Sequence, residues 1–218
     1  VMRQNLLFNT LEAIEFNQNR KNSDIKLFEF GNVYHKFDEK FNENKHLMIS
    51  VSGQKNSQRW NEVQNEVSYF TIKGMVDQII ERLGIDKNRK SGAIKNNPLL
   101  EDGETISIAK KEVVSIGWVK ASILKDFGIK KNVFVADFDW NVVMELIKMN
   151  RIKFKSITKF QSVRRDFSLL LSEEVKFSQL QELALKCDNK ILRKVDLFDV
   201  YEGKNLDKGK KSYALSFV

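Results

Sequence analysis

Cysteine, proline and long apolar runs are scarce in this chain of 218 residues, which holds one cysteine, Cys187, and one proline, Pro98. A single cysteine excludes an internal disulfide and fits a reducing compartment such as the cytoplasm. We expect Cys187 to pack in the core, because it lies on the apolar side of a predicted helix. No run of 18 apolar residues occurs, so the sequence predicts no transmembrane helix and no membrane partner. No signal peptide is visible at the start.

Motifs for nucleotide and metal chemistry are also missing. The sequence has neither a Walker-type Gly-x-x-x-x-Gly-Lys-Ser/Thr loop nor a Gly-x-Gly-x-x-Gly run, which excludes a P-loop. His35 and His46 have no cysteine or carboxylate at ligand spacing, so no zinc site is expected. A Ser-His-Asp triad stays open from sequence, although nothing resembles a nucleophile elbow. These absences disfavour a free-standing enzyme.

Basic charge is present and unevenly placed. Lysine and arginine total 37 against 29 aspartates and glutamates, for a net charge of +8. Residues 151–218 hold 15 basic and 9 acidic residues, a net of +6, while residues 1–150 hold 22 and 20. The concentration in the last third suits a polyanionic partner there, with a merely soluble basic surface as the alternative.

Residues 1–150 read as an antiparallel sheet flanked by helices, an α+β arrangement. Periodicity predicts helices over 2–21, 69–85, 121–129 and 139–150, and strands over 26–37, 46–53, 105–109, 113–118 and 133–138. Gly31 indicates a bulge or a close approach within its strand. We expect Asp139 to cap the last of these helices and Trp60 to anchor a loop or lid-like connection. Residues 87–103 are polar, with Gly92 and Pro98 as breakers.

Residues 154–218 read as strand, helix, strand, hairpin and strand. The run at 167–171 predicts a buried strand, a helix follows with Ser178 as its N-cap, and further strands are expected over 191–201 and 212–218. This order is the first part of a ferredoxin-like βαββαβ fold. We therefore expect a truncated βαββ domain, incomplete at its C-terminus, in a chain cut from a longer protein.

Several motifs carry a family resemblance. The runs 160-FQSVRRD-166, 198-FDVYEG-203 and 210-KKSYALSF-217 resemble the ferredoxin-fold anticodon-binding domain that ends the β subunit of bacterial phenylalanyl-tRNA synthetase. The family pattern there is Phe-Pro-x-x-x-Arg-Asp, Phe-Asp-x-Tyr-x-Gly and Lys-Lys-Ser, and Gln161 replaces the proline. Upstream, 3-RQNLL-7, 27-LFEFG-31, 70-FTIKG-74 and 114-VSIGWV-119 resemble the class II synthetase-like core of that subunit.

One segment departs from the family. Where many members read His-Pro-Gly-Arg-x-Ala, this chain has 99-LLEDGETIS-107, without arginine or histidine. ATP chemistry needs arginines on phosphates and acids on magnesium, so this core is expected to be non-catalytic. Glu29 is then expected to be a structural carboxylate with a charged partner.

The resemblance implies two domains: a synthetase-like, non-catalytic core over 1–150 and an anticodon-binding domain over 151–218. It implies a subunit of a ligase that attaches phenylalanine to its tRNA using ATP and magnesium, with the active site on a partner α subunit in an α2β2 tetramer. This part would bind the α subunit and tRNA and would hold no cofactor, metal or catalytic residue itself. Apolar segments 27–30 and 133–138, with Trp60, are the expected surface for the α subunit.

Candidate RNA contacts are basic residues at two strand starts and one aromatic side chain: Arg164, Arg165, Tyr201, Lys210 and Lys211. The cations suit RNA phosphates. Tyr201, with Phe198 as a second candidate, suits stacking on an unpaired base, and a core tyrosine is the equal alternative. Strand alternation places small residues on one face of the last strand, which leaves room for bases to lie flat. Asp166 and Asp199 are expected to orient the arginines.

A second class of function explains the same features without the resemblance. An α+β adaptor that binds protein would have this composition, with its basic charge incidental, because a fold alone does not fix a function. Salt-dependent binding of tRNA would separate the two interpretations.

Overall fold

The computed structural model describes residues 2–38, 40–56, 59–61, 63–85, 89–94, 97–149, 159–188, 190–203 and 206–218. The chain divides into two compact units, residues 1–153 (unit 1) and 154–218 (unit 2). The expected boundary between residues 150 and 151 lies outside the described residues.

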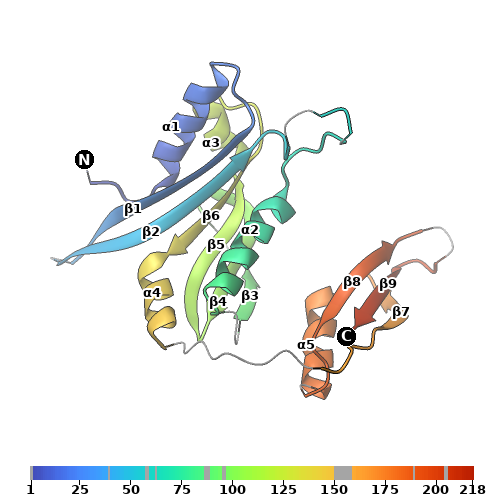
Figure 1. Cartoon of the computed structure of the whole chain (residues 1–218). Coiled ribbons are helices and arrows are strands. Elements are labelled where there is room, and N and C mark those ends of the chain that lie inside the picture. The colour runs from blue at the N-terminus through green and yellow to red at the C-terminus, as the bar shows by residue number, and fades with distance from the viewer. Residues whose placement is uncertain are drawn as a thin grey trace. The chain divides into compact units, whose positions relative to one another are not determined.

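Unit 1 is built on a six-stranded antiparallel sheet with the order β1-β2-β6-β5-β4-β3 (Figure 1). Its strands are β1 (Ile25–Phe37), β2 (Lys40–Ser52), β3 (Arg89–Ala93), β4 (Leu100–Ile108), β5 (Lys111–Val119) and β6 (Val133–Asp139). The central strands carry the buried apolar residues that their sequence predicts. The expected α+β sheet is confirmed.

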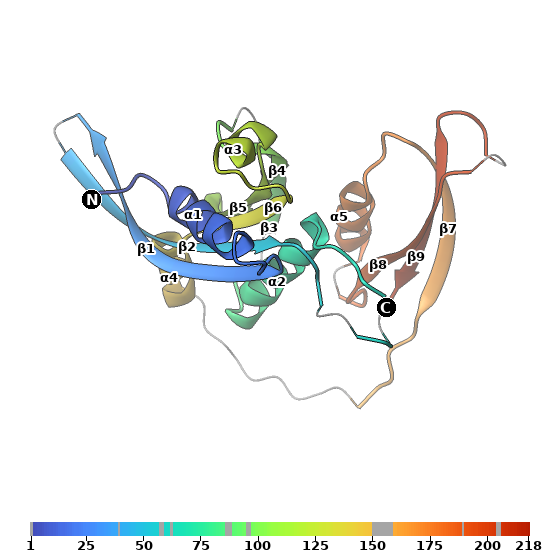
Figure 2. The same ribbon diagram turned by 90° about the horizontal axis from the view of Figure 1, so that it is seen from above.

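Two pairs of helices cover the two faces of this sheet (Figure 2). They are α1 (Leu7–Gln18), α2 (Tyr69–Arg82), α3 (Ala121–Asp126) and α4 (Trp140–Met149). Helices α2 and α4 pack on one face, and α1 and α3 on the other, each pair closing its own apolar cluster. Among the described residues, none of the helices is long and apolar enough to cross a membrane.

Local sequence explains where these helices begin and end. The Asn5 side-chain oxygen accepts from the Leu7 amide at 3.1 Å at the start of α1. Asp139 Oδ1 accepts from the amides of Asn141 and Val142 at 3.0 and 3.1 Å, which confirms the expected cap of α4. Helix α2 ends before Gly84, whose φ of 66° a residue with a side chain rarely adopts.

Two expectations for unit 1 were wrong, and one strand was missed. Trp60 does not anchor its loop, because its side chain is 99% exposed. No strand was predicted within the polar stretch 87–103, which contains β3 and the start of β4. Strand β6 cannot offer a surface to a partner, because it lies inside the sheet with Val133, Ala136 and Phe138 buried.

Gly31 sits in a continuous register opposite His46, so its strand has no bulge there. A close approach explains the glycine instead. A Cβ at this position would lie 2.0 Å from the Arg3 guanidinium and 2.9 Å from the Leu6 side chain. The N-terminal segment therefore packs directly over β1.

Unit 2 is a three-stranded antiparallel sheet of order β7-β9-β8 with one helix (Figure 1). Its elements are β7 (Arg165–Ser172), α5 (Phe177–Cys187), β8 (Val195–Tyr201) and β9 (Lys210–Phe217). The strand–helix–strand–strand order agrees with the ferredoxin-like expectation. Tyr213 and Leu215, on the α5 side of β9, are buried.

Burial in unit 2 differs from what the sequence predicted. Strand β7 is an edge strand, and Phe167 and Leu170 are exposed rather than buried. Cys187 is exposed at the end of α5 and does not pack in the core. Ser178 is not the N-cap, because α5 begins at Phe177 and the amide of the preceding residue, Lys176, donates to Gln179. Helical spacing predicted the helix but not which of its residues are covered.

Candidate nucleic-acid interface

The sheet of unit 2 has one face toward α5 and one face without a helix among the described residues. Residues directly opposite in an antiparallel pair share a face, so the register assigns side chains to each. The face away from α5, called the open face, carries residues from all three strands: Asp166, Ser168, Leu170, Asp196, Asp199, Tyr201, Ser212, Ala214 and Ser216. The hydroxyl oxygens of Ser168 and Ser212 lie 3.1 Å apart at its centre. Ser216 is buried, so the accessible small residues are those nearer the start of β9.

Arg164 is held at one end of the open face. Its Nε donates to Asp166 Oδ1 at 2.7 Å, and its guanidinium carbon lies 5.2 Å from the centroid of the Phe198 ring. The hydrogen bond and charge of Asp166 raise the pKa of Arg164 further above its ordinary value. Asp166 therefore orients this arginine, as expected. Phe198 stands at a register shift in β8 between Leu197 and Asp199, which adds it to the open face.

Tyr201 lies at the other end of β8, opposite Ser212. Its side chain is 45% exposed, so it is not a core tyrosine in this structure. A Cβ at position 203 would lie 2.3 Å from the Cζ and hydroxyl of Tyr201. The glycine of the Phe-Asp-x-Tyr-x-Gly motif thus makes room for the ring. The sequence could not predict this contact, because it does not show which way the Tyr201 ring turns.

The four candidate cations are not brought together. Arg165 pairs with Phe217, whereas Lys210 pairs with Ser172 at the far end of the same ladder. Seven residue steps separate these ends, roughly 23 Å. Alternation also places Arg165 on the α5 side of β7, while Lys210 is exposed beside Asp207 at 2.8 Å.

Lys211 occupies a different position from the one expected. Its side chain is 7% exposed, and its Nζ donates to the carbonyl of Glu173 at 2.7 Å. The same ammonium lies 4.7 Å from the centroid of the Tyr213 ring. Its hydrogen bond and its contact with the ring hold the β7–α5 connection against β9, so we leave Lys211 out of the candidate interface.

Unit 1 contains charged pairs with structural roles. Arg3 Nη1 lies 2.6 Å from Glu29 Oε1, and this ion pair gives Glu29 the charged partner that was expected. His46 Nδ1 lies 2.8 Å from Asp137 Oδ1, a pairing across 91 positions that spacing in the sequence could not reveal. Burial lowers the pKa of His46, but the hydrogen bond to Asp137 and the charges of Asp137 and Asp139 outweigh it and raise the pKa overall. Among the described residues no three potential metal ligands cluster.

Lys73, from the run 70-FTIKG-74, ties α2 to β4 through an ion pair with Glu104. Burial raises the pKa of Glu104, but hydrogen bonds from Lys73 and Tyr69 and the charge of Lys73 outweigh it and leave the pKa below its ordinary value. Burial and the Glu104 charge in turn raise the pKa of Tyr69. On the same side, Arg89 of β3 pairs with Asp77 of α2 at 2.7 Å. These two ion pairs join α2 to β4 and to β3, so their role is structural.

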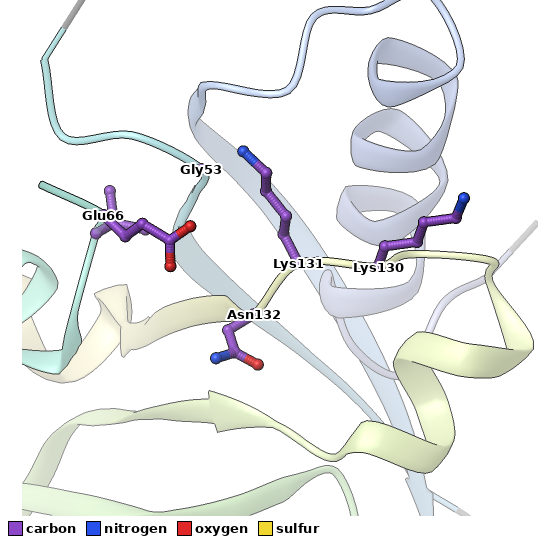
Figure 3. Close-up of a pocket in the computed structure, with 6 residues that line it drawn as sticks. Gly53, Glu66, Lys130, Lys131 and Asn132 are labelled. Atoms are coloured by element: carbon purple, nitrogen blue, oxygen red, sulfur yellow. The ribbon is translucent and has the colours of Figure 1, made fainter. Parts of the chain in front are cut away.

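A small polar pocket of about 180 Å³ lies where β2 ends and β6 begins (Figure 3). Gly53, Glu66, Lys130, Lys131 and Asn132 line it together with Val67. Figure 3 shows the side chains of Lys130 and Lys131 diverging rather than pointing to one place. Lys131 also lies 3.8 Å from Asp24. The pocket has no convergent set of groups for a ligand.

Comparison with known proteins identifies both units. The family model described as the phenylalanyl tRNA synthetase beta chain CLM domain matches residues 1–140, and the ferredoxin-fold anticodon binding domain matches residues 158–218. Phenylalanine–tRNA ligase β subunits of Bacteroides thetaiotaomicron and Bacteroides fragilis are 40% and 38% identical over 227 residues. Each alignment covers the whole of this chain and 28% of the relative, so the chain spans little more than a quarter of their length.

Solved structures show the fold alone. A pyrrolysyl-tRNA synthetase from Desulfitobacterium hafniense aligns with a TM-score of 0.52 and 15% identity, over 67% of this chain and 50% of that one. The likeness is to a class II synthetase, in keeping with the antiparallel sheet of unit 1. With both family models matched and the whole chain aligned to β subunits, the chain belongs to the family of phenylalanine–tRNA ligase β subunits.

Proposed function

We propose that this chain acts as part of the β subunit of a phenylalanine–tRNA ligase, in which unit 2 binds the anticodon region of tRNA and unit 1 binds the α subunit. The whole ligase would be a cytoplasmic α2β2 tetramer that attaches phenylalanine to its tRNA with ATP and magnesium. The boundary between the two roles would lie near residues 150 and 151, beside the division into units at residue 153. Both roles are of binding, not catalysis.

The open face of unit 2 carries the RNA-binding proposal. Proteins recognise unpaired RNA bases by stacking them on aromatic rings and by placing cations near the backbone. Tyr201 offers a half-exposed ring held over Gly203, and Arg164 offers a guanidinium held by Asp166 and Phe198. The accessible residues Ser212 and Ala214 have small side chains, so no large side chain of β9 covers this part of the open face. A ring and a cation held in place on one face support an RNA platform over a protein-binding adaptor.

We propose that unit 1 does not bind ATP. The segment 99-LLEDGETIS-107 carries carboxylates where a triphosphate would need cations. One of these carboxylates, Glu104, is already engaged by Lys73. We therefore assign ATP and magnesium to the whole ligase and to no residue of this chain.

Binding of tRNA to the assembled α2β2 ligase, measured over a range of salt concentration, tests the proposal. Arg164→Ala is expected to lower the salt slope of log K by about one unit, because one phosphate contact is lost. Lys186→Ala is the matched control, since this exposed lysine lies on α5, on the other side of the sheet. Equal slopes for wild type and Arg164→Ala, or the same loss in Lys186→Ala, would overturn the assignment of the open face.

A further inference from the structure

Unit 1 has an open apolar groove of about 430 Å³ between α2 and the edge of the sheet. Its floor comes from β2 and its walls from β1 and α2. The side chains that define it are Phe28, Phe30, Ile49, Met75 and Ile79, with Lys26 and Arg82 at its rim. We call it the α2 groove.

The sequence of α2 explains why the groove stays open. One stripe of the helix, Ile72, Val76 and Ile80, is buried against the sheet. A second stripe, containing Met75 and Ile79, faces the groove. On the other side of the groove, β1 is the outermost strand of the sheet, and its Phe28 side chain is 74% exposed. An apolar surface of this kind, lying in a groove with a charged rim, is typical of a binding site.

The charges at the groove select the kind of partner. The only charged side chains that line it among the described residues are the cations Lys26 and Arg82. Lys26 Nζ donates to the carbonyl of Lys55 at 2.6 Å, which fixes one cation in place. A partner segment with carboxylates beside its apolar side chains would complement both.

The length of the groove wall suits a short helix. Met75 and Arg82 are seven residues apart on α2, about 10 Å or two helical turns. A partner helix laid along this wall would insert side chains at i, i+3 or i+4, and i+7, the spacing of helix-in-groove recognition. An extended strand would instead add to the outer edge of β1 and would leave the groove unfilled.

We propose that the α2 groove binds an acidic amphipathic helix of the α subunit. The inference rests on the proposed function, in which unit 1 binds that subunit. It adds the surface used and the chemistry of the segment that occupies it: an apolar stripe that contacts Phe28 and Phe30, flanked by carboxylates that pair with Lys26 and Arg82.

The test measures association of this chain with the α subunit by titration calorimetry. Phe28→Glu is expected to weaken binding roughly tenfold or more, because it places a charge in an apolar contact. Phe41→Glu is the matched control, a phenylalanine of the same hairpin that is 69% exposed outside the groove, and it should leave binding unchanged. Arg82→Glu should weaken binding by less, and the loss should shrink at high salt.

A photo-crosslinking amino acid at position 28, followed by mapping of the joined peptide, identifies the occupant. Crosslinking to a helical segment of the α subunit rich in carboxylates supports the proposal. Crosslinking to a second copy of this chain, to a basic segment, or to nothing overturns it. If the wild-type chain binds the α subunit while Phe28→Glu binds equally well, the groove proposal alone fails. If the wild-type chain does not bind at all, the proposed role of unit 1 fails with it.

Discussion

At the scale of single residues, the position of the tyrosine on the open face depends on a neighbour that has no side chain. Tyr201 can lie where it does because position 203 has no side chain. In the same way Arg164 points along the open face because Asp166 and Phe198 hold it. The site is therefore made by positioning residues within the Phe-Asp-x-Tyr-x-Gly and Arg-Arg-Asp runs as well as by the groups that would touch RNA.

Gly203→Ala should move the Tyr201 ring while leaving the stability of the fold nearly unchanged. The new methyl group would displace the exposed Tyr201 ring, so the free energy of unfolding should change by less than about 0.5 kcal/mol. Affinity of the assembled ligase for tRNA should fall by up to about 1–3 kcal/mol, the value of one stacked base. Gly92→Ala is the control, because nothing lies within 4 Å of a Cβ there. Unchanged tRNA affinity in Gly203→Ala would show that the ring position does not matter.

At the scale of elements, α2 is joined to the sheet by charge as well as by apolar packing. The Lys73–Glu104 pair lies between α2 and β4, and Arg89–Asp77 lies between β3 and α2. The pKa of Glu104 is below its ordinary value of 4.5, because the bonds from Lys73 and Tyr69 outweigh burial. A lowered carboxyl pKa contributes stability above pH 4.5 that is lost as the pH falls through the folded-state value.

Glu104→Gln should therefore destabilise the chain in a pH-dependent way. At pH 7 the free energy of unfolding should fall by about 1–2 kcal/mol, since Lys73 loses a charged partner. Below pH 4.5 the difference from wild type should shrink, because the wild type loses the same contribution there. Urea unfolding at pH 7, 5, 4 and 3 checks this, with exposed Glu112→Gln as the control. A difference that stays constant with pH would refute the role given to the pair.

An element could be predicted from the sequence where its apolar residues recur at a regular spacing. Helices α2 and α4 and strands β5 and β6 were predicted because they bury apolar residues at regular spacing. Strand β3 was missed because an edge strand of sequence Arg-Lys-Ser-Gly-Ala has no such pattern. Periodicity also predicted α5, yet Cys187 proved exposed, since a helix can present more apolar residues than its sheet covers. The His46–Asp137 pair joins distant strands and had no local signal.

At the scale of the whole molecule, the account predicts a chain that binds tRNA and the α subunit but does not activate phenylalanine. Pyrophosphate exchange dependent on ATP and phenylalanine should stay at background for the purified chain. The reason is the segment 99–107, where carboxylates stand in place of phosphate-binding arginines. The α2β2 ligase is the positive control in the same assay. Exchange above background by the chain alone would contradict the non-catalytic role of unit 1.

The central claim, that the open face of unit 2 contacts the anticodon, is tested most directly by a double-mutant cycle in the assembled ligase. One change is Tyr201→Ala, and the other replaces single anticodon nucleotides of the tRNA by abasic ones. If Tyr201 stacks on one of these bases, each change alone should cost about 1–3 kcal/mol of binding free energy, and at that position both together should cost little more than either. Additive losses at every anticodon position, with Tyr201→Ala folded, would contradict the account.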